Sequence, residues 1–471
     1  MTQEVAKAFE EQSKINFMLA KDKSIEVDGY SGFVFTAKSG RPLMPNGVNS
    51  VLYNIVDRIF IGRMDNGELA MAGVGVAFPI LMLISAFSAL IGMGGAPLCA
   101  IKMGEKNNDE AEKIMSNSFS MLLIIAVILT TGFLIFKEPI LWAFGASEAT
   151  IGYALDYLSI YVLGTIFVQI ALGMNSYINT QGFAKIGMMT VVIGAVINIV
   201  LDPIFIFVFD LGVKGAALAT VAGQMVSALW VLKFLFGKKS ILKIRKKYMV
   251  PDLKVVGSTM ALGVSPFIMQ STESLVLISL NTRLSMFGGD IAVGAMTIMS
   301  SIMQIILMPL QGLAQGAQPI VSYNYGAKDG EKMLVFYKLS NRTSIIIGII
   351  FALLCFVFGR EIISVFTSDK ELINISYIAV NINNLAYLFI GKNLTTTMYY
   401  QAIEIPKYSN MICAMRSILI LPIVLVIMAK AFGENGIWIS MAISEFMIIL
   451  ISKKIFNINK CTENAVTNLA S

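Results

Sequence analysis

The chain has 471 residues, of which 56% are hydrophobic and 14% are charged. Soluble domains carry about 25% charged residues, so this composition and a mean hydropathy of +0.74 exclude a string of soluble domains and indicate a polytopic membrane protein. The sequence has no histidine, which removes the usual general base, the usual zinc ligand and the neutral-pH switch. Its cysteines lack metal or redox spacing and are expected to be free thiols: Cys99, Cys355, Cys413 and Cys461.

Residues 1–46 form a polar segment unlike the rest of the chain. They lack the basic start and following apolar stretch of a secretory signal. The stretch GYSGFVFTAKSGRPLMPNGVNSVL (residues 29–52) resembles a piece of a phage-type tyrosine recombinase. A complete recombinase needs a His-x-x-Arg motif, which a chain without histidine cannot supply. Residues 1–46 are therefore expected to be a polar cytoplasmic tail, either a recombinase-derived fragment or a segment particular to this chain.

The first apolar segment, residues 48–62, is unusually short. Its residues would span only about 22 Å as a helix, whereas the hydrocarbon core of a bilayer is about 30 Å thick. The sequence therefore predicts a truncated first helix.

Longer apolar segments follow and, with this first one, predict twelve helices and an all-α integral membrane protein. The segments run approximately over residues 70–101, 111–136, 152–181, 186–209, 213–236, 255–286, 291–323, 334–358, 372–402, 409–431 and 436–457.

The charges in the loops alternate along the chain. Lysine and arginine gather in every second loop, most densely in residues 237–254, while acidic residues dominate the loops between. The positive-inside rule then makes both termini and this basic loop cytoplasmic. The loop could bind anionic lipid or nucleic acid, but we interpret it as a topology signal and a linker, with no nucleic-acid partner. This divides the chain into a tail (1–46), a six-helix lobe (47–236), the linker (237–254), a second six-helix lobe (255–457) and a cytoplasmic tail (458–471).

The two lobes resemble each other at an offset of about 220 residues. GMGGAPLCAIKMGEKNNDEAEK from Gly92 parallels GLAQGAQPIVSYNYGAKDGEK from Gly312, and GVKGAALATVAGQ from Gly212 parallels GENGIWISMAISE from Gly433. Six spans repeated in the same orientation imply two bundles related by a pseudo-twofold axis along the membrane normal. Two such bundles can rock against each other, which is the motion of alternating access.

An aspartate-proline pair, Asp202-Pro203, lies inside an apolar run. A carboxylate within a membrane span costs a few kcal/mol, so it is a functional-site hypothesis by default. Asn198 lies four residues earlier and therefore on the same helix face. The turn to the next helix falls near residues 211–212, which puts Thr220 at the same depth as Asp202, about 13 Å from the turn. Oxygen side chains at one depth predict a small cation or proton site.

These motifs resemble the multidrug and toxic compound extrusion (MATE) family, nearest its bacterial MepA-like branch. The resemblance rests on YNIVDRIFIG (53–62), the NxxxDP of 198–203, GVKGAALAT (212–220) and the repeated segments above, and it covers residues 52–460. The family implies a V-shaped, twelve-helix antiporter in the bacterial plasma membrane. It would export drugs such as organic cations in exchange for H⁺ or Na⁺. It would work as a monomer among membrane lipids, with no cofactor and no metal beyond Na⁺.

The resemblance also implies site residues. The cation or proton site of the family's first lobe falls on Asp57, Asn198, Asp202 and Thr220, and Glu273 resembles an acid that some members keep in the second lobe. The chain departs from the family in its tenth helix, where Asn383 and Asn384 stand and no acid is present, which puts a full second site in doubt. Four amides on intramembrane helices could line a drug cavity or act in packing alone: Gln169, Asn175, Gln270 and Gln304.

Structural alternatives stand beside these interpretations. Asp202 could pair with Lys214, and Asp57 could pair with Arg58, although neighbours on a helix point about 100° apart. Glu273 could serve only as an interhelical hydrogen-bonding group.

Other functions also remain open. A flippase for lipid-linked intermediates would need a basic cavity, yet Lys392 and Arg416 are the only intramembrane cations away from predicted helix ends, which favours drugs. A recombination event could instead have left a transport-impaired chimera. An enzyme is not expected, because the sequence shows no nucleophile–base set and no metal cluster.

Overall fold

The structure is a computed structural model that describes residues 26–27, 30–31, 60–61, 64, 67–144, 146–364 and 370–455. The truncated first segment, apart from residues 60–61, lies outside the described residues, as do the recombinase-like stretch, apart from residues 30–31, and the tail 458–471. At the N-terminal side, β1 (Glu26–Val27) and β2 (Tyr30–Ser31) form a two-stranded antiparallel pair.

The chain divides into two compact units. Unit 1 is Met1–Gly263 and unit 2 is Val264–Ser471. The division falls just after the start of α10 (Leu253–Gly326), beyond the basic loop that was expected to link the lobes.

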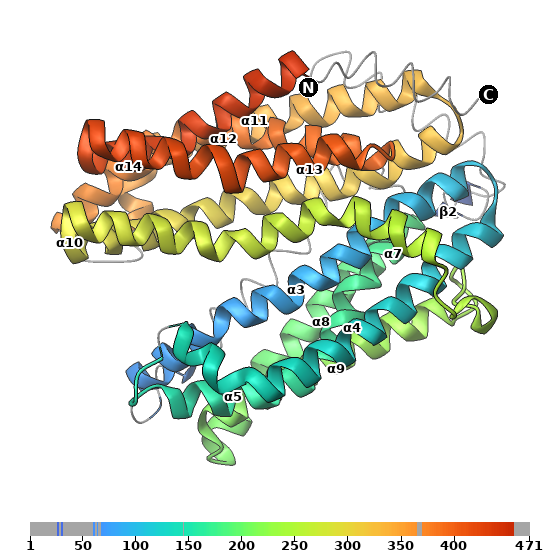
Figure 1. Cartoon of the computed structure of the whole chain (residues 1–471), viewed down its shortest axis with the longest axis horizontal. Coiled ribbons are helices and arrows are strands. Elements are labelled where there is room, and N and C mark those ends of the chain that lie inside the picture. The colour runs from blue at the N-terminus through green and yellow to red at the C-terminus, as the bar shows by residue number, and fades with distance from the viewer. Residues whose placement is uncertain are drawn as a thin grey trace. The chain divides into compact units, whose positions relative to one another are not determined.

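Unit 1 is built from α-helices of various lengths, two π-helices and one 3-10 helix (Figure 1). Its elements are α3 (Gly67–Gly104), α4 (Asn108–Ala143), α5 (Ile151–Leu163), α6 (Thr165–Val168), the π-helix η1 (Gln169–Gly173), α7 (Asn175–Thr180), α8 (Ala184–Pro203), the π-helix η2 (Ile204–Val208), α9 (Gly212–Leu235) and the 3-10 helix η3 (Lys246–Tyr248). The predicted segment 152–181 is bent by 56° between α5 and α6. The bend falls at Gly164, where a Cβ would lie 2.5 Å from Val221 of α9, so only glycine allows this approach.

Unit 2 contains the rest of α10, α11 (Gly330–Ser364), α12 (Lys370–Ala402), α13 (Pro406–Ala414), the π-helix η4 (Met415–Ile420) and α14 (Leu421–Ile455). The structure assigns helical conformation across residues 287–290, where a loop between two spans was predicted. A straight helix of 74 residues would be about 111 Å long, which exceeds a bilayer core of about 30 Å. Figure 1 shows the chain running out along α10 and returning, so this element supplies both predicted spans.

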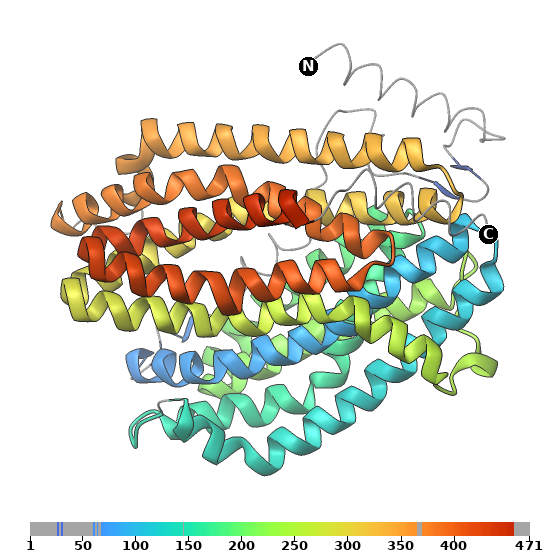
Figure 2. The ribbon, with the colours of Figure 1, turned by 45° about the horizontal axis from the view of Figure 1, so that its top comes forward.

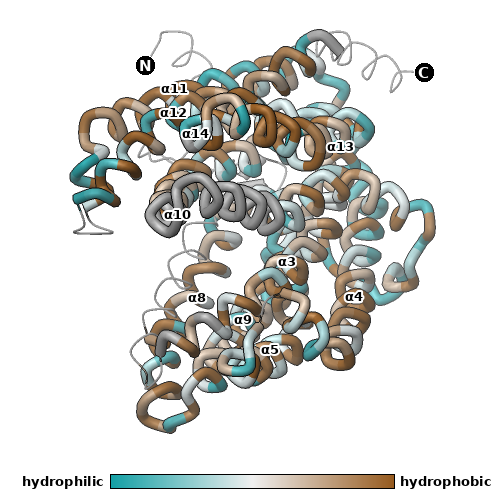
Figure 3. Tube along the Cα trace, turned by 60° about the vertical axis from the view of Figure 1, so that its left-hand side comes forward, coloured by the Kyte–Doolittle hydropathy of each residue, from teal (hydrophilic) through white to brown (hydrophobic). Residues whose placement is uncertain are grey.

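Helices account, within the part of the chain that the structure describes, for every apolar segment predicted from residue 70 onward. Within the described residues, nine helices are long and apolar enough to cross a membrane, or ten if the bent pair counts as one span. α14 holds the end of the segment predicted at 409–431 and the described part of the segment predicted at 436–457, separated at Gly433 by a non-helical backbone (φ 59°, ψ −133°). Figure 3 shows hydrophobic residues along the lengths of the helices. The outer faces carry exposed apolar side chains such as Ile128 and Phe356, as a surface in contact with hydrocarbon requires.

Each unit has its own core. In unit 1, Ile84 of α3, Tyr157 of α5 and Ile206 of η2 are buried in one apolar cluster. In unit 2, Tyr387 of α12 and Trp438 of α14 are buried in another. These cores hold the helices of each unit at fixed spacing around its polar side chains.

The turns of the two units repeat, as the internal similarity predicted. Lys106 and Lys328 both adopt φ of 60° in turns with the same backbone hydrogen bonds. Gly182 and Glu404 likewise close equivalent turns with positive φ. Gly212 (φ 54°) begins α9, and Gly433 (φ 59°) lies at the break within α14. All three pairs are about 220 residues apart, which is the offset of a parallel repeat.

The basic loop is fastened to unit 1. Glu112 of α4 accepts hydrogen bonds from the backbone N–H of Lys243 (2.9 Å) and from Nε of Arg245 (2.8 Å). Asn117 donates to the carbonyl of Tyr248 at 2.9 Å. The carboxamide oxygen of Gln181 accepts from the Leu242 N–H at 2.9 Å. Figure 2 shows the basic loop beside the N-terminal end of α4. These contacts make the loop part of unit 1.

Candidate functional site

The structure brings together three residues that the sequence singled out. Asn198 Nδ2 donates to Asp202 Oδ1 at 3.1 Å and to Thr220 Oγ1 at 3.3 Å. Asp202 is fully buried, and Asn198 and Thr220 are 2% and 6% exposed. One amide group therefore joins a carboxylate on α8 to a hydroxyl on α9.

Local sequence explains this meeting. Asn198 and Asp202 are one α-helical turn apart, and α8 ends at Pro203, which lacks an N–H. The chain then passes through the π-turn η2 and reverses at Gly212, whose positive φ suits glycine. A Cβ on Gly223 would lie 2.6 Å from the carbonyl oxygen of Gly194, so glycine lets α8 and α9 approach closely.

The alternative pairing of Asp202 with Lys214 is wrong. The Lys214 ammonium lies 3.4 Å from Asp156 Oδ1, and both of these side chains are about half exposed. The lysine is near the turn and reaches a partner on α5 instead of reaching inward. Asp202 therefore keeps its carboxylate among the buried polar groups of α8 and α9.

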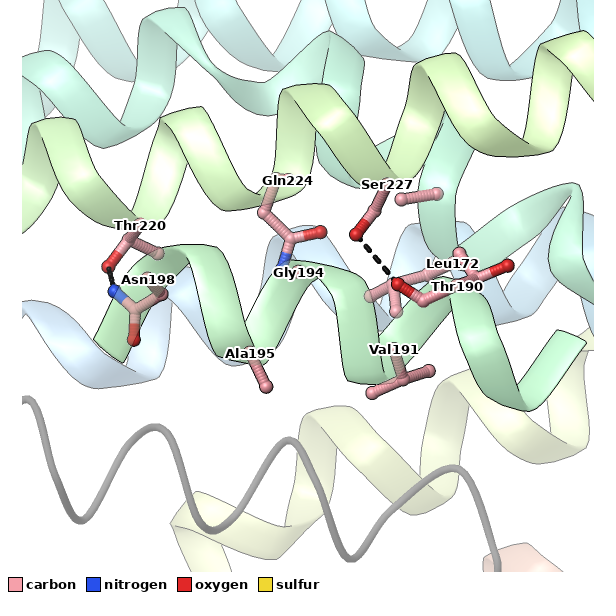
Figure 4. Close-up of a pocket in the computed structure, with 10 residues that line it drawn as sticks. Leu172, Thr190, Val191, Gly194, Ala195, Asn198, Thr220, Gln224 and Ser227 are labelled. Atoms are coloured by element: carbon pink, nitrogen blue, oxygen red, sulfur yellow. Dashed lines mark hydrogen bonds between the residues drawn. The ribbon is translucent and has the colours of Figure 1, made fainter. Parts of the chain in front are cut away.

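A small cavity adjoins this cluster. It has an interior volume of about 30 Å³, enough for a water molecule or a small ion. Its walls come from η1, α8 and α9, and the lining residues are Ala171, Leu172, Thr190, Val191, Gly194, Ala195, Asn198, Thr220, Gln224 and Ser227. Figure 4 shows Asn198 and Thr220 at one end and the hydrogen bond from Ser227 to the carbonyl of Thr190 (2.8 Å) at the other. Asn198 Oδ1 has no hydrogen-bond partner among the described residues.

Sequence reasoning missed Gln224 and Ser227, which line the cavity on α9. They follow Thr220 by four and seven residues, and this spacing puts all three on one helix face. The helical period could have found them once Thr220 was chosen. Figure 4 shows the Gln224 side chain directed toward Gly194 on α8.

The amides predicted to line a drug cavity do not line this one. Gln169 donates to the carbonyl of Ile84 at 2.9 Å, and Asn175 donates to the carbonyl of Gly187 at 3.2 Å. Both amides join helices within unit 1. In unit 2, Gln270 is half-buried and Gln304 is exposed.

Two of the predicted acids have side chains outside the described residues. Asp57 lies outside the described residues, and so does the side chain of Glu273, whose backbone belongs to α10. Asn383 and Asn384 are buried on α12, where Asn384 donates to Asn381 Oδ1 at 3.2 Å.

Unit 2 holds a second buried polar cluster. Arg416 of η4 donates through Nε to Glu445 Oε1 of α14 at 2.5 Å, with side-chain exposures of 19% and 3%. Asn393 of α12 donates to Glu445 Oε2 at 2.7 Å and to the Glu445 carbonyl at 3.0 Å. The sequence had marked Arg416 as an intramembrane cation but had missed the acid that pairs with it.

The donor sets limit the chemistry of these clusters. Among the residues that the structure describes, no three His, Cys, Asp or Glu side chains gather as a metal site. The carboxylate, amide and hydroxyl of unit 1 offer hard oxygen donors, which suit a proton or an alkali cation. The acid of unit 2 already has a guanidinium partner.

Comparison with known families decides the fold family. The MatE family model matches residues 42–204 and again residues 266–427. The chain belongs to the MATE family. The double match follows the internal repeat, and it confirms the family and the all-α MATE transporter fold that the sequence motifs predicted.

The relatives agree with this assignment. A multidrug export protein MepA of Staphylococcus saprophyticus is 26% identical over 409 residues, covering 87% of this chain and 90% of the relative. Its counterpart in Staphylococcus aureus is 25% identical over 414 residues with the same coverage. Together with the apolar helices, they make this MATE chain a multi-pass membrane protein of the MepA-like branch.

Solved structures share the fold. A MOP superfamily transporter from Pyrococcus furiosus superposes with a TM-score of 0.82 at 22% identity, over 91% of this chain and 94% of that one. An outward-facing multidrug resistance MATE transporter gives a TM-score of 0.83 at 22% identity with the same coverage.

Proposed function

We propose that this MATE chain is a cation-coupled multidrug exporter that exchanges H⁺ or Na⁺ for drugs such as organic cations by alternating access. The relatives named multidrug export proteins cover nearly the whole chain and support this substrate class. We further propose that it works as a monomer in the bacterial plasma membrane, with both termini cytoplasmic.

The observation that carries the proposal is the buried carboxylate of Asp202, joined through Asn198 to Thr220 beside a small cavity. An acid kept within a membrane span, facing polar groups, marks an ion or proton pathway. When ionised, Asp202 attracts a cation, and the Asn198 and Thr220 oxygens can replace part of its hydration shell. When protonated, it loses that attraction. In our proposal Asp57 adds a second acid to the site.

Coupling follows from this competition. A proton or Na⁺ bound at Asp202 removes the negative charge that a cationic drug needs, so drug and ion bind alternately. The cavity in unit 1 is about 30 Å³, whereas drug sites measure about 300–1,000 Å³. The cavity therefore suits the coupling ion or a water molecule, and drug binding requires a wider opening elsewhere or in another conformation.

Proteoliposomes test the proposal. Ethidium efflux driven by an imposed proton or sodium gradient is expected for the native chain, and Asp202→Asn should reduce the driven rate at least about tenfold, since it removes the titrating group. Asp210→Asn is the matched control, because Asp210 is exposed, lies just beyond η2 and has a positive φ that asparagine tolerates. Gradient-driven efflux that persists in Asp202→Asn would contradict the proposal.

The two alternatives receive less support. A flippase for lipid-linked pyrophosphates would need unneutralised intramembrane cations, yet Arg416 is paired with Glu445. The transport-impaired chimera concerns residues 1–50, and it predicts normal expression without efflux, with activity recovered when an ordinary first helix is grafted on.

A further inference from the structure

The residues of the polar cluster in unit 2 correspond, through the internal repeat, to residues that line the cavity in unit 1. The repeated turns supply the register. Arg416 follows the turn at Glu404 by as many residues as Gly194 follows the turn at Gly182. Arg416 in unit 2 therefore corresponds to Gly194 in unit 1.

The other two members of the cluster obey the same register. Glu445 follows Gly433 by as many residues as Gln224 follows Gly212. Asn393 precedes Glu404 by as many residues as Ala171 precedes Gly182, so Asn393 corresponds to Ala171. All three counterparts in unit 1, Ala171, Gly194 and Gln224, line the cavity.

The different residues at these corresponding positions explain why unit 1 has free space there and unit 2 has charged side chains. Gly194 and Ala171 leave room in unit 1, and a Cβ on Gly194 would lie 2.4 Å from the Ser227 hydroxyl, another cavity-lining group. At the same two positions unit 2 has an arginine and an asparagine, and both reach the carboxylate of Glu445. The guanidinium of Arg416 in unit 2 thus lies at positions that correspond to the cavity in unit 1.

We propose that Glu445 and Asn393 form a second cation-binding site whose occupant is the guanidinium of Arg416. The Glu445 carboxylate is the ligand, Asn393 holds it in place through its hydrogen bonds, and a monovalent cation is the chemical class that the site accepts. Arg416 holds the site permanently filled, because a covalently attached cation cannot leave. The proposal concerns unit 2 alone and does not depend on the proposed transport function.

The buried surroundings of Glu445 require that its negative charge be compensated by another group. Asn393 is 3% exposed and Glu445 is 2% exposed, so water does not compensate the acid. The counterparts of Asn198 and Thr220 in unit 2 are apolar, Ile420 and Met441, so they offer the acid no side-chain oxygen or nitrogen. An acid in such surroundings requires a bound cation or proton.

The test removes the tether and supplies a free cation. Purified full-length Arg416→Ala should unfold at a lower temperature than the native chain. Guanidinium chloride at millimolar concentration should then raise its Tm by about 3 °C relative to choline chloride at equal ionic strength, because ligand binding to the folded state stabilises it. Sodium chloride is the second probe. Arg416→Ala/Glu445→Gln should gain nothing from either cation.

Arg360→Ala is the matched control, since Arg360 is exposed on α11 of the same unit. It should show no cation-specific change in Tm. An Arg416→Ala chain that is as stable as the native one, or whose Tm rises equally with and without the Glu445 carboxylate, overturns the proposal.

A second variant covers the case in which Arg416→Ala does not fold. Arg416→Met/Glu445→Met removes both charges and keeps apolar volume at both positions. Recovery of a folded protein supports a role in charge compensation. A double variant that fails as completely as the single one shows that the two side chains serve packing, and it overturns the proposal.

Discussion

The buried acids of the two units have different partners. Asp202 in unit 1 accepts a hydrogen bond from the Asn198 amide, which also donates to the Thr220 hydroxyl beside a cavity, whereas Glu445 in unit 2 meets an amide and a guanidinium. Both acids belong to corresponding helix pairs of one repeat. The comparison teaches that a repeated scaffold can hold one buried carboxylate close to a cavity and another against a guanidinium attached to the chain.

Neutralising each of the two acids in turn is the strongest test of this comparison. Glu445→Gln leaves the Arg416 guanidinium buried without its counter-charge, and breaking a buried pair costs about 3–5 kcal/mol. Asp202→Asn should cost less, since an asparagine oxygen can still accept the hydrogen bond that Asn198 donates to the carboxylate. Thermal unfolding of the two variants in the same detergent measures the difference. Equal losses of Tm would mean that the two acids do not differ as described.

The narrow contact between α8 and α9 offers a smaller test. A Cβ on Gly223 would meet the Gly194 carbonyl oxygen at 2.6 Å, so Gly223→Ala must push the helices apart. We expect a loss of about 1–3 kcal/mol in unfolding free energy, together with slower efflux because Asn198 and Thr220 separate. Gly132→Ala on α4 is the control, since nothing lies within 4 Å of its added Cβ. Unchanged stability in Gly223→Ala would show that the approach of α8 and α9 is not tight.

The smallest effect concerns the loop fastened to unit 1. The Lys113 ammonium, 2.9 Å from Asp252, holds the pKa of that carboxyl below its ordinary value, with help from the Lys254 N–H. A carboxyl with a lowered folded-state pKa stabilises the fold above its ordinary pKa of about 3.9 and loses that effect as the pH falls through the folded value. The Tm difference between the native chain and Asp252→Asn should therefore be constant from pH 5 to 7 and shrink below pH 4. A difference that grows with acidity would reverse the assigned sign.

Part of the site could be predicted from the sequence because helical geometry determines it. Four-residue spacing fixed Asn198 above Asp202, and equal distances from the turn at Gly212 brought Thr220 to the same depth. Sequence alone did not distinguish polar groups in a cavity from those that join helices. Gln169 was such a case, because its partner is a backbone carbonyl of α3, which leaves no trace in side-chain patterns.

The pair of Arg416 and Glu445 shows another limit. The acid lies within the very segment that was aligned with residues 212–224, and the alignment sets it opposite Gln224. Its partnership depends on how η4 directs Arg416 toward α14, and π-helical turns have no sequence signature that would have revealed this direction. Gly288, Gly289 and Asp290 are typical of loops and led to the loop predicted at residues 287–290, whereas the structure assigns these residues helical conformation within α10, which reverses along its length.

The π-turns η1, η2 and η4 each adjoin one of these polar groups. Such a turn contains an extra residue relative to an α-turn, and π-turns within α-helices are frequent at functional sites. Moving such a turn along its helix by one residue rotates the residue that it passes by about 100° and leaves the rest of the helix in place. A span equipped in this way can swivel a buried side chain toward or away from its neighbours without unwinding in the lipid.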